Sequence, residues 1–305
     1  MLNIKHYTID EFDENFPDDN ACLKEVFNQQ FGNLKECPRC TNPAKFYKIT
    51  GRKRYDCQYC AYQIHPLADT IFYKSSTSLK KWFRIIYQFS VSKNGVSAYE
   101  IRRMLGVTYK CALRMARQIR SMCFSKKEKS NKSKLKGTVE VDETYIGGKR
   151  RGKRGRGAEG KTPVIGIVER GGEIKATVTE NTKAKTILPL IKENVEEKTK
   201  VMTDEYSSYN KVSSLDYVHD YVSHSKKEYV RGEVHTNTVE GFWSQLKRSI
   251  NGTYHSVSKK YLQFYVDEFA YRYNLRHSGP LFPHWIALLA GKPSLRDQKI
   301  SFSHL

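Results

Sequence analysis

The sequence predicts a multidomain protein, with small modules in its N-terminal third and an α/β domain in the remainder. Two CxxC pairs lie in a turn-rich segment, 35–68, and apolar residues recur at helical spacing within 76–124. Strand-like runs begin only after a lysine-rich stretch, 125–136. At 305 residues, the chain is long enough for two or three domains and at least one sizeable core.

The expected domain boundaries follow these changes in composition. From the N-terminus we expect a helical lead-in at 1–34, a cysteine-rich module at 35–68, a helical region at 76–124, a basic linker at 125–136, the α/β domain at 137–290 and a tail at 291–305.

The charge of the chain favours a polyanionic partner. The formal net charge is +21, although residues 1–36 carry −5, so the rest of the chain carries +26. Nucleic acid is the usual partner of such a surface, and a merely basic protein is the alternative. The sequence has no apolar run of about 18 residues and no signal-like N-terminus, so we expect no membrane span and a cytoplasmic location.

The cysteines predict a zinc ribbon. Two CxxC pairs, separated by sixteen residues, are formed by Cys37, Cys40, Cys57 and Cys60. Each pair can place two thiolates on one turn, and two such turns complete a tetrahedral Zn²⁺ site. The odd total of seven cysteines argues against a disulfide framework. We therefore expect structural zinc, with basic residues of the intervening segment free to touch DNA.

Residues 97–122 predict two helices joined at Gly106, with Ser97 as the cap of the first. A short helix, a glycine turn and a polar-fronted second helix resemble a helix-turn-helix, which lays its second helix in the major groove. We expect DNA contacts from Lys110, near the start of the second helix, and from a basic face formed by Arg114, Arg117 and Arg120. An ordinary helical hairpin with a solvated basic face is the alternative.

The order of elements after residue 137 is that of an RNase H-like fold, parts of which other α/β domains share. A helical run, 184–196, lies between the third and fourth strand-like runs, and a long helix begins near Thr236, with more helix to about Arg276. The strand-like runs are 137–146, 163–169, 173–180, 199–203 and 217–223.

Three carboxylates in this domain form a candidate catalytic set. Asp142 lies in the first strand, Asp204 ends the fourth, and Glu240 follows after thirty-five residues in the long helix. Carboxylates that converge at strand ends can hold two divalent cations about 3.5–4 Å apart, one to activate water or a 3′-hydroxyl and one to stabilise the leaving oxygen. All-oxygen ligands suit Mg²⁺ or Mn²⁺.

The helix geometry agrees with this assignment. The apolar residues Val239, Phe242, Trp243, Leu246 and Ile250 form one stripe. At 100° per residue, Glu240 and Lys247 lie within about 20° of each other at the edge of that stripe. The stripe can therefore pack on the sheet while Glu240 reaches the strand ends, and Lys247 can contact DNA phosphate beside them.

Other carboxylates compete for these roles. Glu143 is adjacent to Asp142, Glu205 is adjacent to Asp204, and Glu140 shares a strand face with Asp142. Alternatives to a DNA-joining enzyme are a non-catalytic DNA-binding regulator and a metal-dependent nuclease without strand transfer.

The sequence resembles the DDE transposases of bacterial insertion sequences that carry an N-terminal zinc ribbon, the ISXO-like group related to Merlin elements. The resemblance covers nearly the whole chain and rests on CPRC, CQYC, VDETYIGGK (141–149), TDEYSSY (203–209) and the long motif at 235–274. It implies Asp142, Asp204 and Glu240 as the triad, Lys247 as the accompanying lysine, an RNase H-like fold, Mg²⁺, and recognition of terminal inverted repeats. The expected partners are double-stranded DNA, as element ends and target, and further copies of the chain in the synaptic complex.

A glycine-broken basic segment, 149–161, follows the first catalytic strand. We expect it to form a loop at the mouth of the site that contacts the DNA backbone, and a solvated loop is the alternative. The residues expected to make these contacts are Lys149, Arg150, Arg151, Lys153, Arg154 and Arg156.

Overall fold

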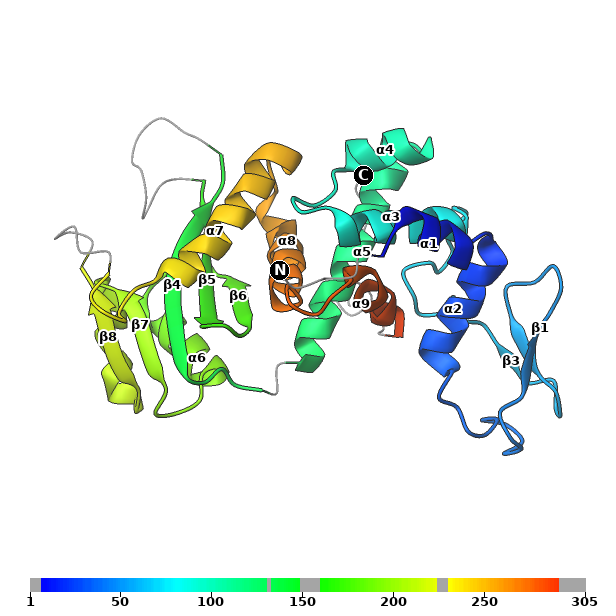
Figure 1. The fold of residues 1–305 in the computed structure, drawn as a ribbon, viewed down its shortest axis with the longest axis horizontal. Coiled ribbons are helices and arrows are strands. Elements are labelled where there is room, and N and C mark those ends of the chain that lie inside the picture. Colours follow the sequence, from blue (N-terminus) through cyan, green and yellow to red (C-terminus); the bar gives the residue numbers. More distant parts are fainter. Residues whose placement is uncertain (1–6, 131–132, 149–159, 224–229, 291–305) are drawn as a thin grey trace. The chain divides into compact units, whose positions relative to one another are not determined.

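The computed structural model describes residues 7–130, 133–148, 160–223 and 230–290 (Figure 1). The described residues form two compact units. One unit contains the residues before Lys127 and after His277, and the other contains the residues between them.

The first unit begins with two short helices, α1 (Ile9–Asn15) and α2 (Asp19–Phe31). Thr8 and Asp18 cap them, because their side chains accept hydrogen bonds from first-turn backbone N–H groups. These helices correspond to the lead-in expected at 1–34.

The last described helix, α9 (Leu281–Ala287), also belongs to this unit, which corrects the boundary expected for the α/β domain. Its Trp285 ring lies 5.7 Å from that of Phe89. The ring of Phe282 lies 4.8–5.8 Å from the rings of Tyr7, Phe12, Phe16 and Tyr87. Local periodicity cannot reveal contacts between segments so distant in sequence. The tail expected at 291–305 lies outside the described residues.

Three short antiparallel strands follow α2, namely β1 (Phe46–Lys48), β2 (Tyr55–Cys57) and β3 (Gln63–Ile64). The β1–β2 hairpin turns at Gly51, whose φ of 68° favours glycine. Phe27 of α2 stacks on Tyr55 at 4.1 Å between ring centroids, so this small sheet is anchored to the helices.

A helical region completes the first unit, with α3 (Leu79–Val91), α4 (Ala98–Leu105) and α5 (Tyr109–Ser130). Gly106 ends α4 in the left-handed conformation with φ 64°, as a glycine C-cap does. The turn between two helices is therefore present where the sequence predicts it.

The α5 helix is longer than expected, and this corrects the basic linker at 125–136. The α5 helix continues to Ser130, because lysine and glutamate are good helix formers even where no apolar stripe remains. At the other end of that stretch, Leu135 is buried and bridges to Val195. Both ends of the expected linker are thus parts of folded elements.

The second unit is built on a mixed sheet, five strands of which are described, in the order β6-β5-β4-β7-β8. Parallel pairs join β4 to β7 and β7 to β8, whereas β5 runs antiparallel to β4 and β6. The strands are β4 (Thr138–Ile146), β5 (Thr162–Glu169), β6 (Ile174–Val178), β7 (Lys200–Asp204) and β8 (Val218–Val222).

Helices cover both faces of this sheet (Figure 1). On one face, α6 (Ala184–Asn194) packs with the short 3₁₀ turns Ser207–Tyr209 and Val212–Leu215 over Val139, Val141 and their neighbours. On the other face lie α7 (Asn237–Ser249), which continues into a π-helical turn, Ile250–Tyr254, and α8 (Lys259–Asn274). No described helix is long and apolar enough to cross a bilayer.

Candidate active site and zinc centre

The sheet register brings two of the candidate carboxylates to the same level. On the parallel pair β4 and β7, Glu140 faces Met202, so Asp142 and Asp204 follow two residues further along each strand. Side chains two residues apart share a face of a strand. Asp142, in the middle of β4, and Asp204, the last residue of β7, therefore lie on one face of two neighbouring parallel strands, and the charge of Asp204 acts on Asp142.

Asp142 lies against the helix that covers this face. The indole N–H of Trp243 donates a 3.0 Å hydrogen bond to its Oδ2. Gly166, directly across from Asp142 on β5, makes room for the indole, because a Cβ there would lie 2.6 Å from the ring. Burial, followed by the charges of Glu143 and Asp204, raises the pKa of Asp142 to about 7.

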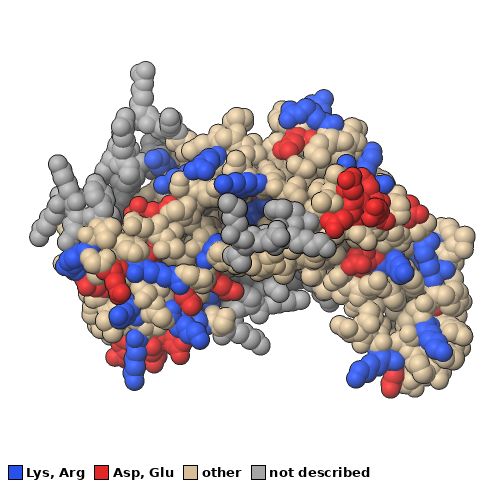
Figure 2. Space-filling model, in the orientation of Figure 1, with Lys and Arg blue, Asp and Glu red and all other residues tan. Residues whose placement is uncertain are grey.

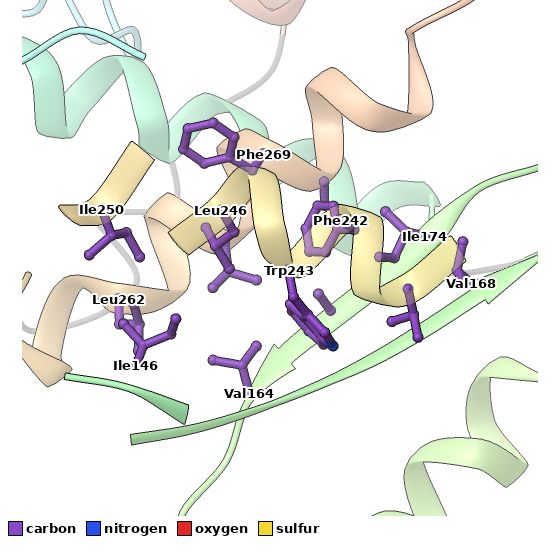
Figure 3. Packing of buried hydrophobic residues seen from close by; sticks show 14 residues of the cluster. Ile146, Val164, Val168, Ile174, Phe242, Trp243, Leu246, Ile250, Leu262 and Phe269 are labelled. Carbon is purple, nitrogen blue, oxygen red and sulfur yellow. The ribbon is translucent and has the colours of Figure 1, made fainter. Parts of the chain in front are cut away.

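The predicted apolar stripe of α7 is confirmed, and it places the third carboxylate. Val239, Phe242, Trp243, Leu246 and Ile250 are all buried against β4, β5, β6 and α8 (Figure 3). The exposed Glu240, in the first turn of α7, accepts a 3.0 Å hydrogen bond from the Thr236 hydroxyl.

Lys247 stands near two of the carboxylates. Burial lowers the pKa of its ammonium group, while the charges of Asp142 and Glu240 act in the opposite direction. An influence of both acids on one ammonium indicates that Lys247 belongs to the same cluster. It stands on the same side of α7 as Glu240, two turns further along, as the helix geometry predicts.

Two of the competing carboxylates have structural partners. Glu143 is buried on the opposite face of β4 and accepts a 2.8 Å hydrogen bond from the Tyr209 hydroxyl. Burial, followed by the charge of Glu143, raises the pKa of Tyr209 well above its usual range, so the phenol stays a donor. Glu205 accepts a hydrogen bond from the Ser223 hydroxyl.

The third competitor, Glu140, is fully buried and is also engaged. Its carboxylate lies at the N-terminus of α7 and pairs with Arg170, whose Nε is 2.7 Å away. Sequence reasoning gave no sign of this role, because Arg170 lies outside any motif. It likewise treated Trp243 only as an apolar residue and missed Gly166, whose importance shows only in the strand pairing.

The donor set of Asp142, Asp204 and Glu240 fits hard divalent cations, which bind carboxylate oxygens. Among the described residues, the four cysteines are the one set of three or more potential metal ligands whose ligand atoms all lie within 4.8 Å of one another. The carboxylate oxygens of Asp142, Asp204 and Glu240 therefore do not all lie that close together. Ligands that serve two cations about 3.5–4 Å apart do not all meet at one point.

The four cysteines form a second candidate metal centre, in the first unit. Their sulfur atoms lie within 4.8 Å of one another, with Cys37 to Cys60 at 3.7 Å and Cys40 to Cys57 at 3.9 Å. Zn–S bonds of about 2.3 Å in a tetrahedron give sulfur–sulfur distances of about 3.8 Å, so the cluster fits Zn²⁺. Burial opposes ionisation of Cys37, but hydrogen bonds from the backbone N–H groups of Arg39 and Cys40 and from the thiols of Cys57 and Cys40 together lower its pKa to about 6.

The expected basic face of α5 holds only in part. Lys110 is exposed, and Arg117 is half-buried. Arg114 donates to the Ser75 hydroxyl at 3.3 Å and lies over the Trp82 ring. Arg120 was wrongly placed on this face: it is buried and donates to the carbonyl of Val96 at 3.0 Å. Steps of three residues rotate backwards on a helix, so six residues separate two side chains by about 120°.

The charged surface of the first unit is uneven. Acidic side chains gather over α1, and Lys and Arg side chains gather over α4 on the face drawn in Figure 2. The six basic residues Lys149, Arg150, Arg151, Lys153, Arg154 and Arg156 lie outside the described residues.

Two family models match the chain. The ISXO2-like transposase domain matches residues 134–274, and the transposase zinc-ribbon domain matches residues 17–63. The first range contains the carboxylate cluster and the second contains the four cysteines. Together the two matches span more than half of the chain.

Individual proteins show the same similarity. An uncharacterized protein in transposable element ISH50 of Halobacterium salinarum is 28% identical over 255 residues, which cover 77% of this chain and 84% of the relative. An uncharacterized transposase-like protein of Haemophilus influenzae is 26% identical over 102 residues, 33% of this chain and 81% of the relative. A pre-cleavage Mos1 transpososome, 11% identical, covers 68% of this chain and 78% of its own at a TM-score of 0.26, too low to establish a common fold.

Proposed function

Because this chain belongs to the ISXO2-like transposases that carry an N-terminal zinc ribbon, we propose that it cuts its element's DNA ends and joins them to target DNA. Asp142, Asp204 and Glu240 are the proposed catalytic carboxylates. The observation that supports the proposal is the β4–β7 register, which puts Asp142, within β4, and Asp204, at the end of β7, on the face covered by the helix of Glu240. The mixed sheet order supports an RNase H-like architecture for this unit.

Each residue of the cluster has a proposed task. Mg²⁺ or Mn²⁺ ions, when bound, supply the positive charge that an in-line phosphodiester displacement requires. Three carboxylates would hold these ions: Asp142 and Asp204 from the sheet, and Glu240 from α7. The Trp243 indole fixes Asp142, and the Thr236 hydroxyl orients Glu240. Lys247 is proposed to contact a DNA phosphate beside the carboxylates, since it lies two turns beyond Glu240 on the same side of α7 and the charges of Asp142 and Glu240 raise its pKa against the effect of burial.

The first unit is the proposed DNA-binding part. Zinc holds the ribbon together, and α4 with α5 acts as a helix-turn-helix that recognises the terminal inverted repeats. Lys110, Arg114 and Arg117 are proposed to contact DNA, Arg114 while it keeps its stacking on Trp82. The basic segment, Lys149 to Arg156, is proposed to contact the DNA backbone. Several copies of the chain act together on element ends and target within the nucleoid.

A product-mapping experiment tests this function. Purified protein is incubated with labelled double-stranded element ends, a target plasmid and Mg²⁺, and the products are resolved on denaturing gels. We expect nicks at the element termini and end–target joints, both lost when Mg²⁺ is chelated. Nicks without joints would assign a nuclease, and end binding without nicks would assign a DNA-binding regulator.

A further inference from the structure

We propose that Glu140 and Arg170 are positioning residues, which together hold the N-terminus of α7 and thereby set the place of Glu240. This inference rests on the proposed function, because it concerns the geometry of the same carboxylate cluster. Glu140 projects from β4 on the face of Asp142, and its side chain is 0% exposed.

Glu140 caps α7 from outside the helix. Its Oε2 accepts hydrogen bonds from the backbone N–H groups of Thr238 at 2.8 Å and Val239 at 3.0 Å. First-turn N–H groups lack partners within a helix and are usually capped by the residue just before it. That residue is Thr236, which makes no capping hydrogen bond to the described backbone of α7. The strand supplies the cap instead.

This arrangement leaves the Thr236 hydroxyl for another partner. It donates to Oε1 of Glu240 at 3.0 Å, so the residue at the capping position orients the proposed catalytic carboxylate. Glu140 and Thr236 thus divide two tasks at one helix end. The first fixes the helix to the sheet, and the second fixes the Glu240 side chain on the helix.

Arg170 completes the attachment. Its Nε donates to Glu140 Oε1 at 2.7 Å, and its two terminal nitrogens donate to the carbonyls of Glu233 at 2.7 Å and His235 at 2.9 Å. One planar guanidinium therefore binds both the buried carboxylate and the segment that leads into α7. A lysine has no such fork and cannot make all three contacts.

The same contacts argue against Glu140 as a metal ligand. Its Oε2 accepts hydrogen bonds from the two backbone N–H groups, and its Oε1 accepts them from Nε of Arg170 and from the Thr238 hydroxyl at 2.8 Å. A carboxylate offers about four lone-pair directions, and the four hydrogen bonds from Thr238 N–H, Val239 N–H, the Thr238 hydroxyl and Arg170 Nε use them. Glu140 therefore acts through the helix and not on the substrate.

The test compares Glu140→Gln with Glu268→Gln. Glu268 is a matched control, because it is equally buried in the same unit and is paired with Arg272 at 2.8 Å, but it lies in α8. For each variant we would measure kcat and KM of end cleavage, and amide hydrogen exchange of the peptide that contains Thr238 and Val239.

We expect Glu140→Gln to lower kcat by about 10²-fold, the cost of a misplacement near 1 Å, with KM for element ends unchanged. The first turn of α7 should exchange faster in this variant and at the wild-type rate in Glu268→Gln. Equal kcat losses in the two variants, or unchanged exchange at α7, would overturn the inference.

A second variant covers the case in which Glu140→Gln does not fold. Arg170→Lys keeps the charge beside Glu140 but loses the fork, so it should show the same kcat loss and faster α7 exchange, more mildly. Wild-type kcat and wild-type exchange in Arg170→Lys would overturn the proposal. If the wild-type protein cleaved no DNA, the proposed function would fail, whereas the exchange comparison would still decide whether Glu140 and Arg170 hold α7.

Discussion

At the scale of single residues, the contact between Asp142 and Trp243 carries the most information. The indole performs two tasks, since its ring fills the core against Gly166 and its N–H fixes one oxygen of the proposed metal ligand. A carboxylate held by one oxygen presents the other in a defined direction. Orientation of this kind distinguishes a prepared site from a surface acid.

Trp243→Phe should therefore slow end cleavage by about 10–100-fold, the equivalent of a lost hydrogen bond to a charged group of about 1.5–3 kcal/mol. The matched control is Phe242→Leu, because Phe242 is buried in the same stripe. It should cost stability, measured by urea unfolding, but leave the cleavage rate of folded protein unchanged. A Trp243→Phe protein that cleaves at the wild-type rate would show that the hydrogen bond has no part in catalysis.

Gly166→Ala examines the same contact from the strand side. The added Cβ would lie 2.6 Å from the indole, so the ring must move. Overpacking of this kind typically costs about 1–3 kcal/mol in the free energy of unfolding. We expect both that loss and slower cleavage, because the displaced indole no longer fixes Asp142.

At the scale of elements, strand-like runs and helical spacing predicted the strands of the second unit and the helices α6, α7 and α8 to within a few residues. The helices could be predicted because each buries one face, which leaves a helical period in the sequence, and the central strands could be predicted because they are short apolar runs buried on both faces. Other features leave no such pattern. The cap that Glu140 provides joins residues 98 apart in sequence, and the packing of Phe282 on Phe12 joins the two ends of the chain.

The site was predictable to a similar extent. Asp142, Asp204 and Glu240 lie on the elements where the sequence placed them, because the two strands and the edge of the helix follow from local patterns. The structure was needed to tell Asp142, the proposed metal ligand, from its competitors Glu140 and Glu143. Glu140 and Glu143 are buried and bonded to residues that lie far away in the sequence, Arg170 for Glu140 and Tyr209 for Glu143.

The zinc ribbon gives a prediction at this scale. Cys57→Ser removes one of four thiolates, and a structural zinc site contributes folding free energy directly. We expect metal analysis to fall from about one zinc per chain to well below one, and element-end binding to weaken. Cys111→Ser is the control, because Cys111 lies outside the cluster near Thr77. Wild-type zinc content in Cys57→Ser would contradict the ribbon assignment.

At the scale of the whole molecule, the proposed DNA-binding residues of α5 and the proposed catalytic carboxylates lie in different units. The cysteine cluster and the α4–α5 pair belong to one unit, and the carboxylate cluster belongs to the other. We therefore expect that a carboxylate can be changed without loss of DNA affinity.

The central claim, that Asp142, Asp204 and Glu240 form one catalytic site, is tested most directly by comparing single neutralising variants in one end-cleavage assay. Asp142→Asn, Asp204→Asn and Glu240→Gln should each lower the cleavage rate by about 10³-fold or more, because each removes several kcal/mol of metal-mediated stabilisation. Binding of labelled ends should stay near wild type. The adjacent controls, Glu143→Gln and Glu205→Gln, should cleave once corrected for folded fraction. Cleavage that survives Asp204→Asn but is lost in Glu205→Gln would contradict the account.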